Sequence, residues 1–307
     1  MNSTPTHLDR NFVGYGPNPP HVFWPEGARV AINIVVNYEA GAEYSLAAGD
    51  ERRDSVGEFG FAINPTRHDV RDLCTESSFE YEARSGVWRL ARIIDEYNLH
   101  VTFNCCGRAL DLNPAVGEYL RNSPHDVMAH GWRWEELWRR TRDEERDHLH
   151  RAIESIEKAC GERPVGWHSR CTPSINTREL IVEEGGFLYD SDAYNDDLPY
   201  FVEVGDNQHL IVPYSLTFND MRFAFPGYAD PISFFNYLRM GFDDLWDEGA
   251  QTPKLMSIGV HGRWAGQPGR ARALRDFIDY TLTKGNVWYA RRLDIAQWWK
   301  THHAEFS

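Results

Sequence analysis

Three residues that can move protons stand at the ends of separate apolar, strand-like runs: Glu39, His130 and His261. A carboxylate and two imidazoles can take up and supply protons. This is the chemistry of hydrolysis by an activated water molecule, with or without a metal ion. Polar side chains that can hold a ligand lie at similar strand ends or in nearby loops, namely Asn104, Arg170 and Asn219.

The residues around His130 have the mixed character of a functional rim. Gly131 allows a tight turn there, and indoles, a guanidinium and carboxylates follow within residues 132–136. Taken by itself, His130 fits a hydrogen-bonded structural histidine equally well. The hypothesis of a site therefore depends on whether the other candidates come together with it.

The elements that must position these residues alternate between strand and helix. Residues at helical spacing predict helices between the strands, including one capped by Ser85 and one that ends at Gly161. This alternation predicts a parallel sheet, as an open doubly wound sheet or a barrel, with functional residues at the carboxyl ends of the strands. Apolar runs predict strands over residues 28–38, 100–106, 126–131, 165–170, 187–192, 210–214, 254–261 and 287–291.

The bulk properties exclude several classes of partner. The chain has 307 residues, of which 42% are hydrophobic, and a formal net charge of −14. This charge disfavours nucleic acid and anionic membranes. The apolar runs are too short to span a bilayer, the first residues do not resemble a signal peptide, and five cysteines form no framework. We therefore expect a cytoplasmic protein without nucleic-acid or membrane partners.

Residues 1–28 are rich in proline and glycine and predict an irregular segment that covers a single domain spanning 1–307. Neither a Gly-x-Gly-x-x-Gly loop, a phosphate-binding loop nor a Gly-x-Ser-x-Gly elbow follows a predicted strand. Nucleotide cofactors and serine hydrolysis are thereby disfavoured.

Several segments resemble the polysaccharide deacetylases of the NodB-homology type, and within them the allantoinase-type branch, which opens cyclic ureides. The resemblance covers nearly the whole chain and implies a distorted (β/α) barrel of about seven parallel strands, a small cyclic ureide or imide as ligand, and a homotetramer. The segments that carry it include Val36-Asn-Tyr-Glu39, His130-Gly-Trp-Arg-Trp134, Arg163-Pro-Val-Gly-Trp167, Asn219-Asp-Met-Arg-Phe223 and Ser257-Ile-Gly-Val-His261.

The chain departs from the family at the metal site. Typical deacetylases have Asp-Asp-Gly, with a base and a metal ligand, where this chain has Glu39, Ala40 and Gly41. Typical members also carry two metal-binding histidines in His-x-x-x-His, and the second is Trp134 here. The resemblance thus implies catalysis without a metal or other cofactor, although a metal rebuilt from Glu39, His130 and His261 is an alternative.

In the resulting hypothesis Glu39 is the general base, with a pKa raised by its apolar neighbours, and His261 protonates the leaving nitrogen. His130 orients water or stabilises the oxyanion. Opening of allantoin to allantoate is the favoured reaction. Alternatives are hydrolysis of another cyclic imide, metal-dependent N-deacetylation of a carbohydrate, or binding without catalysis. The residues expected to hold or enclose the substrate are Arg170, Asn219, Asn104, Trp132 and Trp134.

Overall fold

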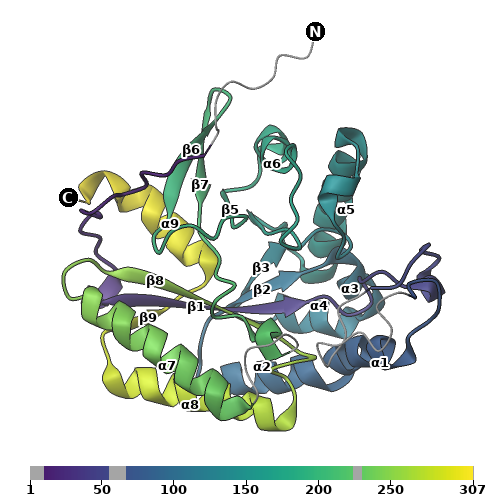
Figure 1. The fold of residues 1–307 in the computed structure, drawn as a ribbon. Coiled ribbons are helices and arrows are strands. Elements are labelled where there is room, and N and C mark those ends of the chain that lie inside the picture. The colour runs from purple at the N-terminus through teal and green to yellow at the C-terminus, as the bar shows by residue number, and fades with distance from the viewer. Residues whose placement is uncertain (1–9, 55–66, 224–229, 307) are drawn as a thin grey trace.

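The computed structural model describes residues 10–54, 67–223 and 230–306. Its strands form one curled sheet in the order β6-β7-β5-β4-β3-β2-β1-β8, and β9 pairs with β1 beside this path (Figure 1). All neighbouring strands are parallel except the β6–β7 hairpin. The strands are β1 (Val30–Tyr38), β2 (Thr102–Cys105), β3 (Asp126–Ala129), β4 (Gly166–Trp167), β5 (Tyr189–Asp190), β6 (Tyr200–Val204), β7 (Asn207–Ile211), β8 (Lys254–His261) and β9 (Val287–Tyr289).

Strand β1 is the centre of this sheet. It is buried along its whole length and pairs with β2 on one side and β8 on the other. Its side chains alternate between the two faces of the sheet, as they must in a strand. Val30, Ile32 and Ile34 pack into the larger apolar core with the outer helices, whereas Ala31 and Val35 belong to a second core on the concave face.

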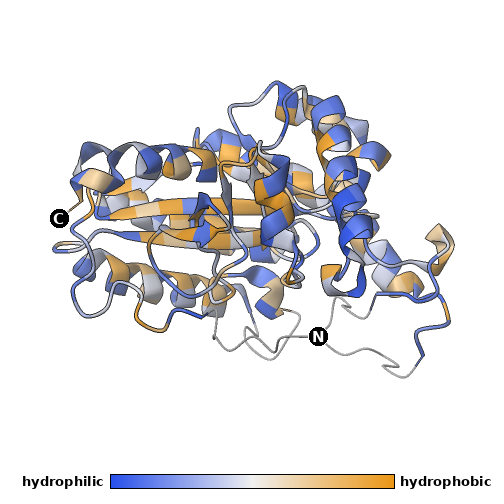
Figure 2. Cartoon of the chain, turned by 90° about the horizontal axis from the view of Figure 1, so that it is seen from above, coloured by the Kyte–Doolittle hydropathy of each residue, from blue (hydrophilic) through white to orange (hydrophobic). Residues whose placement is uncertain are grey.

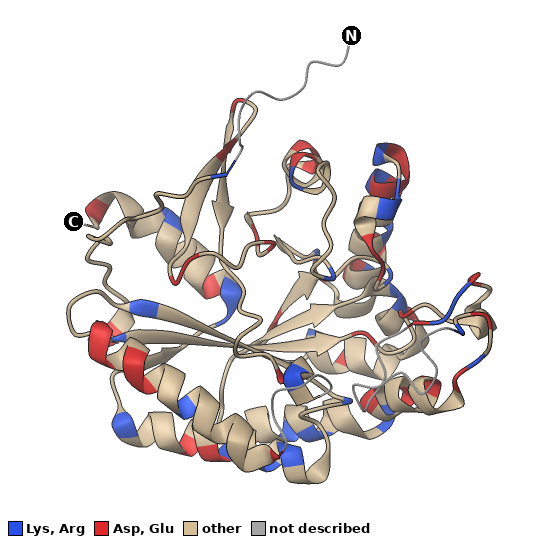
Figure 3. Cartoon of the chain, viewed as in Figure 1, with Lys and Arg blue, Asp and Glu red and all other residues tan. Residues whose placement is uncertain are grey.

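Helices cover the convex face of the sheet, and their apolar sides face the strands (Figure 2). Most charged side chains lie on these helices and on loops (Figure 3). One helix, α9, packs instead into the core on the concave face, through residues such as Trp299. The helices are α1 (Leu73–Tyr81), α2 (Val87–Glu96), α3 (Gly107–Leu112), α4 (Pro114–Arg121), α5 (Arg142–Cys160), α6 (Thr177–Glu184), α7 (Pro231–Glu248), α8 (Pro268–Lys284) and α9 (Arg292–His302).

The predicted α/β fold with mostly parallel strands is confirmed, and each predicted strand has a counterpart. The strands predicted at 165–170 and 187–192 are only two residues long, because the chain turns early into polar loops. The short helix α3 and the antiparallel strand β6 were not predicted. Within the segment 1–28 that was predicted to be irregular, residues 10–24 contain neither helix nor strand, and residues 1–9 lie outside the described ranges. Trp24 donates a hydrogen bond to the carbonyl of Lys254 at 3.0 Å.

The prediction of a helix start at Ser85 was wrong. The helix begins at Leu73, where the Asp72 carboxylate accepts hydrogen bonds from the amides of Cys74 and Thr75. It then passes through a π-helical turn, Glu82–Gly86, into α2. No helix in the described ranges is both long and apolar enough to cross a membrane.

Candidate active site

A cavity of about 140 Å³ lies at the carboxyl ends of β1, β3 and β8. It contains the three proposed proton-transfer residues, and its remaining wall is a mixture of amide, aromatic and basic side chains. The sequence-based expectation that these strand ends converge on one site agrees with this arrangement. The lining residues are Asn37, Glu39, His130, Trp134, His168, Arg170, Cys171, Tyr214, Asn219, Met221, His261 and Trp264.

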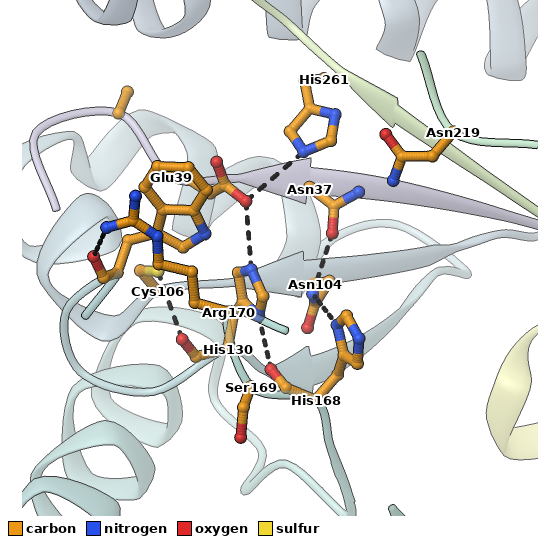
Figure 4. A network of polar contacts seen from close by, with 12 residues as sticks. Asn37, Glu39, Asn104, Cys106, His130, His168, Ser169, Arg170, Asn219 and His261 are labelled. Carbon is orange, nitrogen blue, oxygen red and sulfur yellow. Dashed lines mark hydrogen bonds and ion pairs between the residues drawn. The ribbon is translucent and has the colours of Figure 1, made fainter. Parts of the chain in front are cut away.

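The carboxylate of Glu39 is the centre of the site (Figure 4). One oxygen, Oε1, lies 3.1 Å from His130 Nε2 and 3.4 Å from His261 Nε2. The other, Oε2, accepts a hydrogen bond of 2.6 Å from Arg263 Nη2. Glu39 is 1% exposed, so its interactions with these three side chains act with little screening by water.

Arg263 is itself fixed by a second buried carboxylate. Its Nη1 donates to Glu82 Oε2 at 2.7 Å, and Glu82 Oε1 accepts the backbone N–H groups of Glu39 and Ala40. Glu82 therefore holds both the backbone and, through Arg263, the side chain of Glu39. Neither Glu82 nor Arg263 was a predicted site residue. The only signal for Arg263 was its place two residues after His261.

The expectation of a raised pKa for Glu39 was wrong. Burial alone opposes ionisation of this carboxyl group. The positive charges of Arg263 and His261 and the hydrogen bond from His130 outweigh burial and hold the pKa of Glu39 well below its usual value. Glu39 is therefore a carboxylate at neutral pH, ready to accept a proton but a weaker base than we expected.

His261 has the opposite behaviour. Burial disfavours its charged form, but the neighbouring carboxylates of Asp220 and Glu39 raise its pKa to about 9. Asp220 Oδ1 lies 2.6 Å from His261 Nδ1, while its Oδ2 accepts the backbone N–H groups of His261 and Ala265. His261 is thus an oriented imidazolium at neutral pH, which is the protonation state that a general acid needs.

His130 has an acceptor at each ring nitrogen. Its Nδ1 contacts the carbonyl oxygen of His168, and its Nε2 faces Glu39. A carbonyl oxygen only accepts, so Nδ1 carries a hydrogen. This contact fixes the orientation of the ring, and the ring of His168 stacks on it at 5.3 Å and 3°.

Arg170 and Trp134 form one wall of the cavity. The guanidinium of Arg170 lies 3.6 Å from the centre of the Trp134 ring and pairs with Asp54 at 2.7 Å. Its Nη1 also donates to the carbonyl of Trp134 at 2.9 Å. Both residues line the cavity as predicted, although the charge of Arg170 is already partly balanced.

The other predicted binding residues differ in position. Asn219 lines the cavity. Asn104 is fully buried beneath it and donates hydrogen bonds to Asn37 and His168, so it supports the wall. Trp132 is not among the lining residues. Its ring lies under the guanidinium of Arg151 on α5, 3.2 Å away.

The donor set does not fit a catalytic metal ion. Ala40 and Trp134 stand where the resemblance would place two ligands, and one oxygen of Glu39 is bound by Arg263. Within residues 10–54, 67–223 and 230–306, no three His, Cys, Asp or Glu side chains are grouped so that they could hold a metal ion. An indole has no acceptor that could replace a histidine ligand.

Comparisons with known proteins agree with this architecture. Residues 69–177 match the family model for polysaccharide deacetylases. A Schizosaccharomyces pombe protein named "Putative polysaccharide deacetylase" is 36% identical over 91% of this chain and 93% of its own.

Two solved structures resemble the whole chain. A "probable Polysaccharide deacetylase" from Pseudomonas aeruginosa is 41% identical, covers 96% of this chain and 99% of its own, and has a TM-score of 0.91. The PuuE allantoinase is 39% identical, covers 97% of this chain and 99% of its own, and has a TM-score of 0.92.

Proposed function

This chain belongs to the polysaccharide deacetylase family, and from that premise we propose that it is a hydrolase that opens a cyclic ureide ring without a metal ion. The favoured reaction is the conversion of allantoin to allantoate. One observation carries the proposal. Glu39 is held by Arg263 and two imidazoles, and the indole of Trp134 lies beside it. A metal-dependent deacetylase would need metal ligands at these positions. The similarity to an allantoinase along nearly the whole chain supports the choice of substrate.

In this proposal water adds to a ring carbonyl carbon. Glu39 takes a proton from the water as the new C–O bond forms, and the carbonyl π electrons move to the oxygen. His130 orients the water. Because Glu39 is ionised at neutral pH, the base does not have to lose a proton before it can act.

The second step breaks the ring C–N bond. The oxyanion returns its electrons to form the carbonyl, the bonding pair moves to nitrogen, and His261 supplies the proton that this nitrogen needs. His261 is charged at neutral pH, so it can serve as that acid. Trp134, Arg170 and Asn219 line the same cavity. In this proposal the Trp134 indole covers the flat heterocycle, and Arg170 and Asn219 bind its carbonyl and amide groups.

The test is an assay of allantoin hydrolysis before and after exhaustive chelation, with an N-acetylated sugar as the second substrate. We expect allantoin turnover to be unchanged by chelation and the sugar to remain acetylated. Glu39→Gln should lower kcat by about 100-fold or more, because it removes the base. Turnover that chelation abolishes would contradict the metal-free mechanism, and deacetylation alone would contradict ring opening.

A further inference from the structure

Tyr214 lies in the cavity wall but has no role in the mechanism above. It follows β7, and its ring stacks on that of His168 with centroids 4.4 Å apart and planes at 25°. It is 3% exposed and is one of the residues that line the cavity. Packing therefore fixes the position of the ring, and the hydroxyl group is the part of the Tyr214 side chain that can act on a ligand.

Two amide groups donate to the hydroxyl oxygen of Tyr214. Asn37 Nδ2 lies 3.0 Å from it, and Asn219 Nδ2 lies 3.1 Å from it. The amide orientation of Asn219 is set by its Oδ1, which accepts the N–H of Met221 at 2.8 Å. That of Asn37 is set by its Oδ1, which accepts from Asn104 at 2.9 Å. In Figure 4 the amide groups of Asn37 and Asn219 lie side by side and point toward each other.

These two contacts determine where the phenolic hydrogen can point. A hydroxyl group has two lone pairs and one hydrogen. Since both lone pairs of Tyr214 accept from amides, its hydrogen is directed away from both. Among the side-chain hydrogen bonds of the described residues, the Tyr214 hydroxyl accepts these two and donates none. A bound ligand in the cavity would supply the missing acceptor.

The hydroxyl group lies on the same face of the sheet as the proton-transfer residues. Asn37 precedes Glu39 by two residues and pairs in register with His261. Gly259 precedes His261 by two residues, and a Cβ atom there would lie only 2.1 Å from the Tyr214 hydroxyl oxygen. Side chains two residues apart on a strand point to the same face. The phenol therefore contacts Asn37, one strand repeat before Glu39, and Gly259, one strand repeat before His261.

We propose that the Tyr214 hydroxyl group is a catalytic hydrogen-bond donor to the carbonyl oxygen at which negative charge develops when water adds. The substrate oxygen becomes the acceptor for the phenolic hydrogen, which stays on Tyr214 throughout. This inference rests on the proposed function, because the oxygen concerned belongs to the ring carbonyl that is hydrolysed. A donor already oriented by two amides needs no reorganisation as charge develops.

Burial in the cavity wall raises the pKa of Tyr214 above its ordinary value, and the hydrogen bond from Asn37 only partly opposes this. The phenol therefore remains protonated across the neutral range and remains available as a donor.

The first test is Tyr214→Phe, which keeps the ring on His168 and removes only the hydroxyl group. We expect kcat for ring opening to fall about 100- to 1,000-fold, as for loss of one oxyanion donor, with KM changed by less than about threefold. Tyr289→Phe is the matched control. It also removes an internally bonded phenol, paired with Thr281, but near the opposite end of β1. Its kcat should equal that of the unaltered enzyme.

A second substitution separates a catalytic role from a structural one. A fluorinated tyrosine at position 214 keeps both amide contacts but ionises at lower pH. Because the alkaline limit of activity is set by His261, the readout is kcat at neutral pH. We expect kcat to rise, since a more acidic phenol donates a stronger hydrogen bond to the developing oxyanion, with an unchanged melting temperature.

The outcomes also separate this inference from the proposed function. An unaltered enzyme that opens no cyclic amide would contradict the proposed function. An active enzyme whose Tyr214→Phe variant keeps its kcat within threefold, or whose fluorinated form has the same kcat at neutral pH as the natural enzyme, would overturn the assignment of Tyr214 alone.

Discussion

At the scale of single residues, Glu39 and His261 have pKa values that move in opposite directions for one reason. Each is the buried counter-charge of the other, and each has a further partner of opposite charge, Arg263 for Glu39 and Asp220 for His261. The arrangement therefore maintains a carboxylate and an imidazolium side by side across the neutral range, which is how a site keeps separate base and acid residues.

This pairing makes a prediction for the pH profile of kcat/KM. Glu39 works when ionised, so activity is lost as pH falls through its pKa, which lies well below the usual value for a glutamate. His261 works when protonated, so activity is lost as pH rises through about 9. We expect a broad plateau with an alkaline limb near pH 9, measured by initial rates over the pH range in which the protein stays folded.

Asp220→Asn should move that alkaline limb toward lower pH, because it removes a negative charge that raises the pKa of His261. Asp276→Asn is a suitable control, since Asp276 pairs with Arg272 at the surface. An alkaline limb near pH 6.5 in the unaltered enzyme would contradict the assignment of His261 as the acid.

Some of these site residues could be predicted from the sequence, and others could not. Glu39, His130 and His261 were predictable because each stands at the end of a recognisable strand. Glu82 was not, because it lies 43 residues from its backbone partner Glu39 and within a helix. Its contact with Arg263 depends on tertiary packing that no local pattern encodes. The same is true of Tyr214, whose importance lies in the two amides that meet it.

At the scale of elements, the π-helical turn Glu82–Gly86 places the Glu82 carboxylate against the end of β1. Such turns are frequent at functional sites, because the extra residue redirects a side chain within a continuous helix. Gly86 packs directly on the loop after β8, where a Cβ atom would lie 2.0 Å from the carbonyl oxygen of Gly262. The helical pattern over residues 87–94 was visible in the sequence, but neither this turn nor the close approach was.

The close approach predicts the effect of Gly86→Ala. The added methyl group meets backbone atoms of Gly262, which cannot rotate away, so the loop that follows His261 and contains Arg263 must shift. We expect a loss of about 1–3 kcal/mol in the free energy of unfolding, and a fall in kcat of at least tenfold. Denaturant titration and steady-state kinetics measure the two effects.

Gly269→Ala is the matched control, because a Cβ atom at that position of α8 meets nothing within 4 Å. Its stability should be equal or slightly higher, and its kcat unchanged. If Gly86→Ala behaved like Gly269→Ala, the packing of the π-helical turn would not be what positions the site.

At the scale of the whole molecule, the curled sheet is held closed from within by Arg292. This residue is fully buried at the start of α9. Its guanidinium donates to Ser257 on β8, at one end of the strand order, and to the carbonyl of Pro213 after β7, near the other end, both at 2.8 Å. It also bonds Ser191, Asn33 and the carbonyl of Val212. The sequence predicted the strands, but closure by a buried arginine requires knowledge of their spatial order.

The final prediction concerns Arg292→Met, which keeps much of the side-chain volume but removes all five donor groups. Several buried acceptors then lose their partner, and each costs about 1–3 kcal/mol if it stays unsatisfied. Because some can find other donors, we expect the free energy of unfolding to fall by about 3–5 kcal/mol, measured by denaturant titration.

The neighbouring Arg291→Met is the control. Arg291 is 28% exposed and pairs with Asp294 at the surface, so about 1 kcal/mol or less should be lost. Equal losses in the two variants would show that the two ends of the sheet are joined by apolar packing and backbone contacts, and that the concave face under the active site does not depend on this arginine.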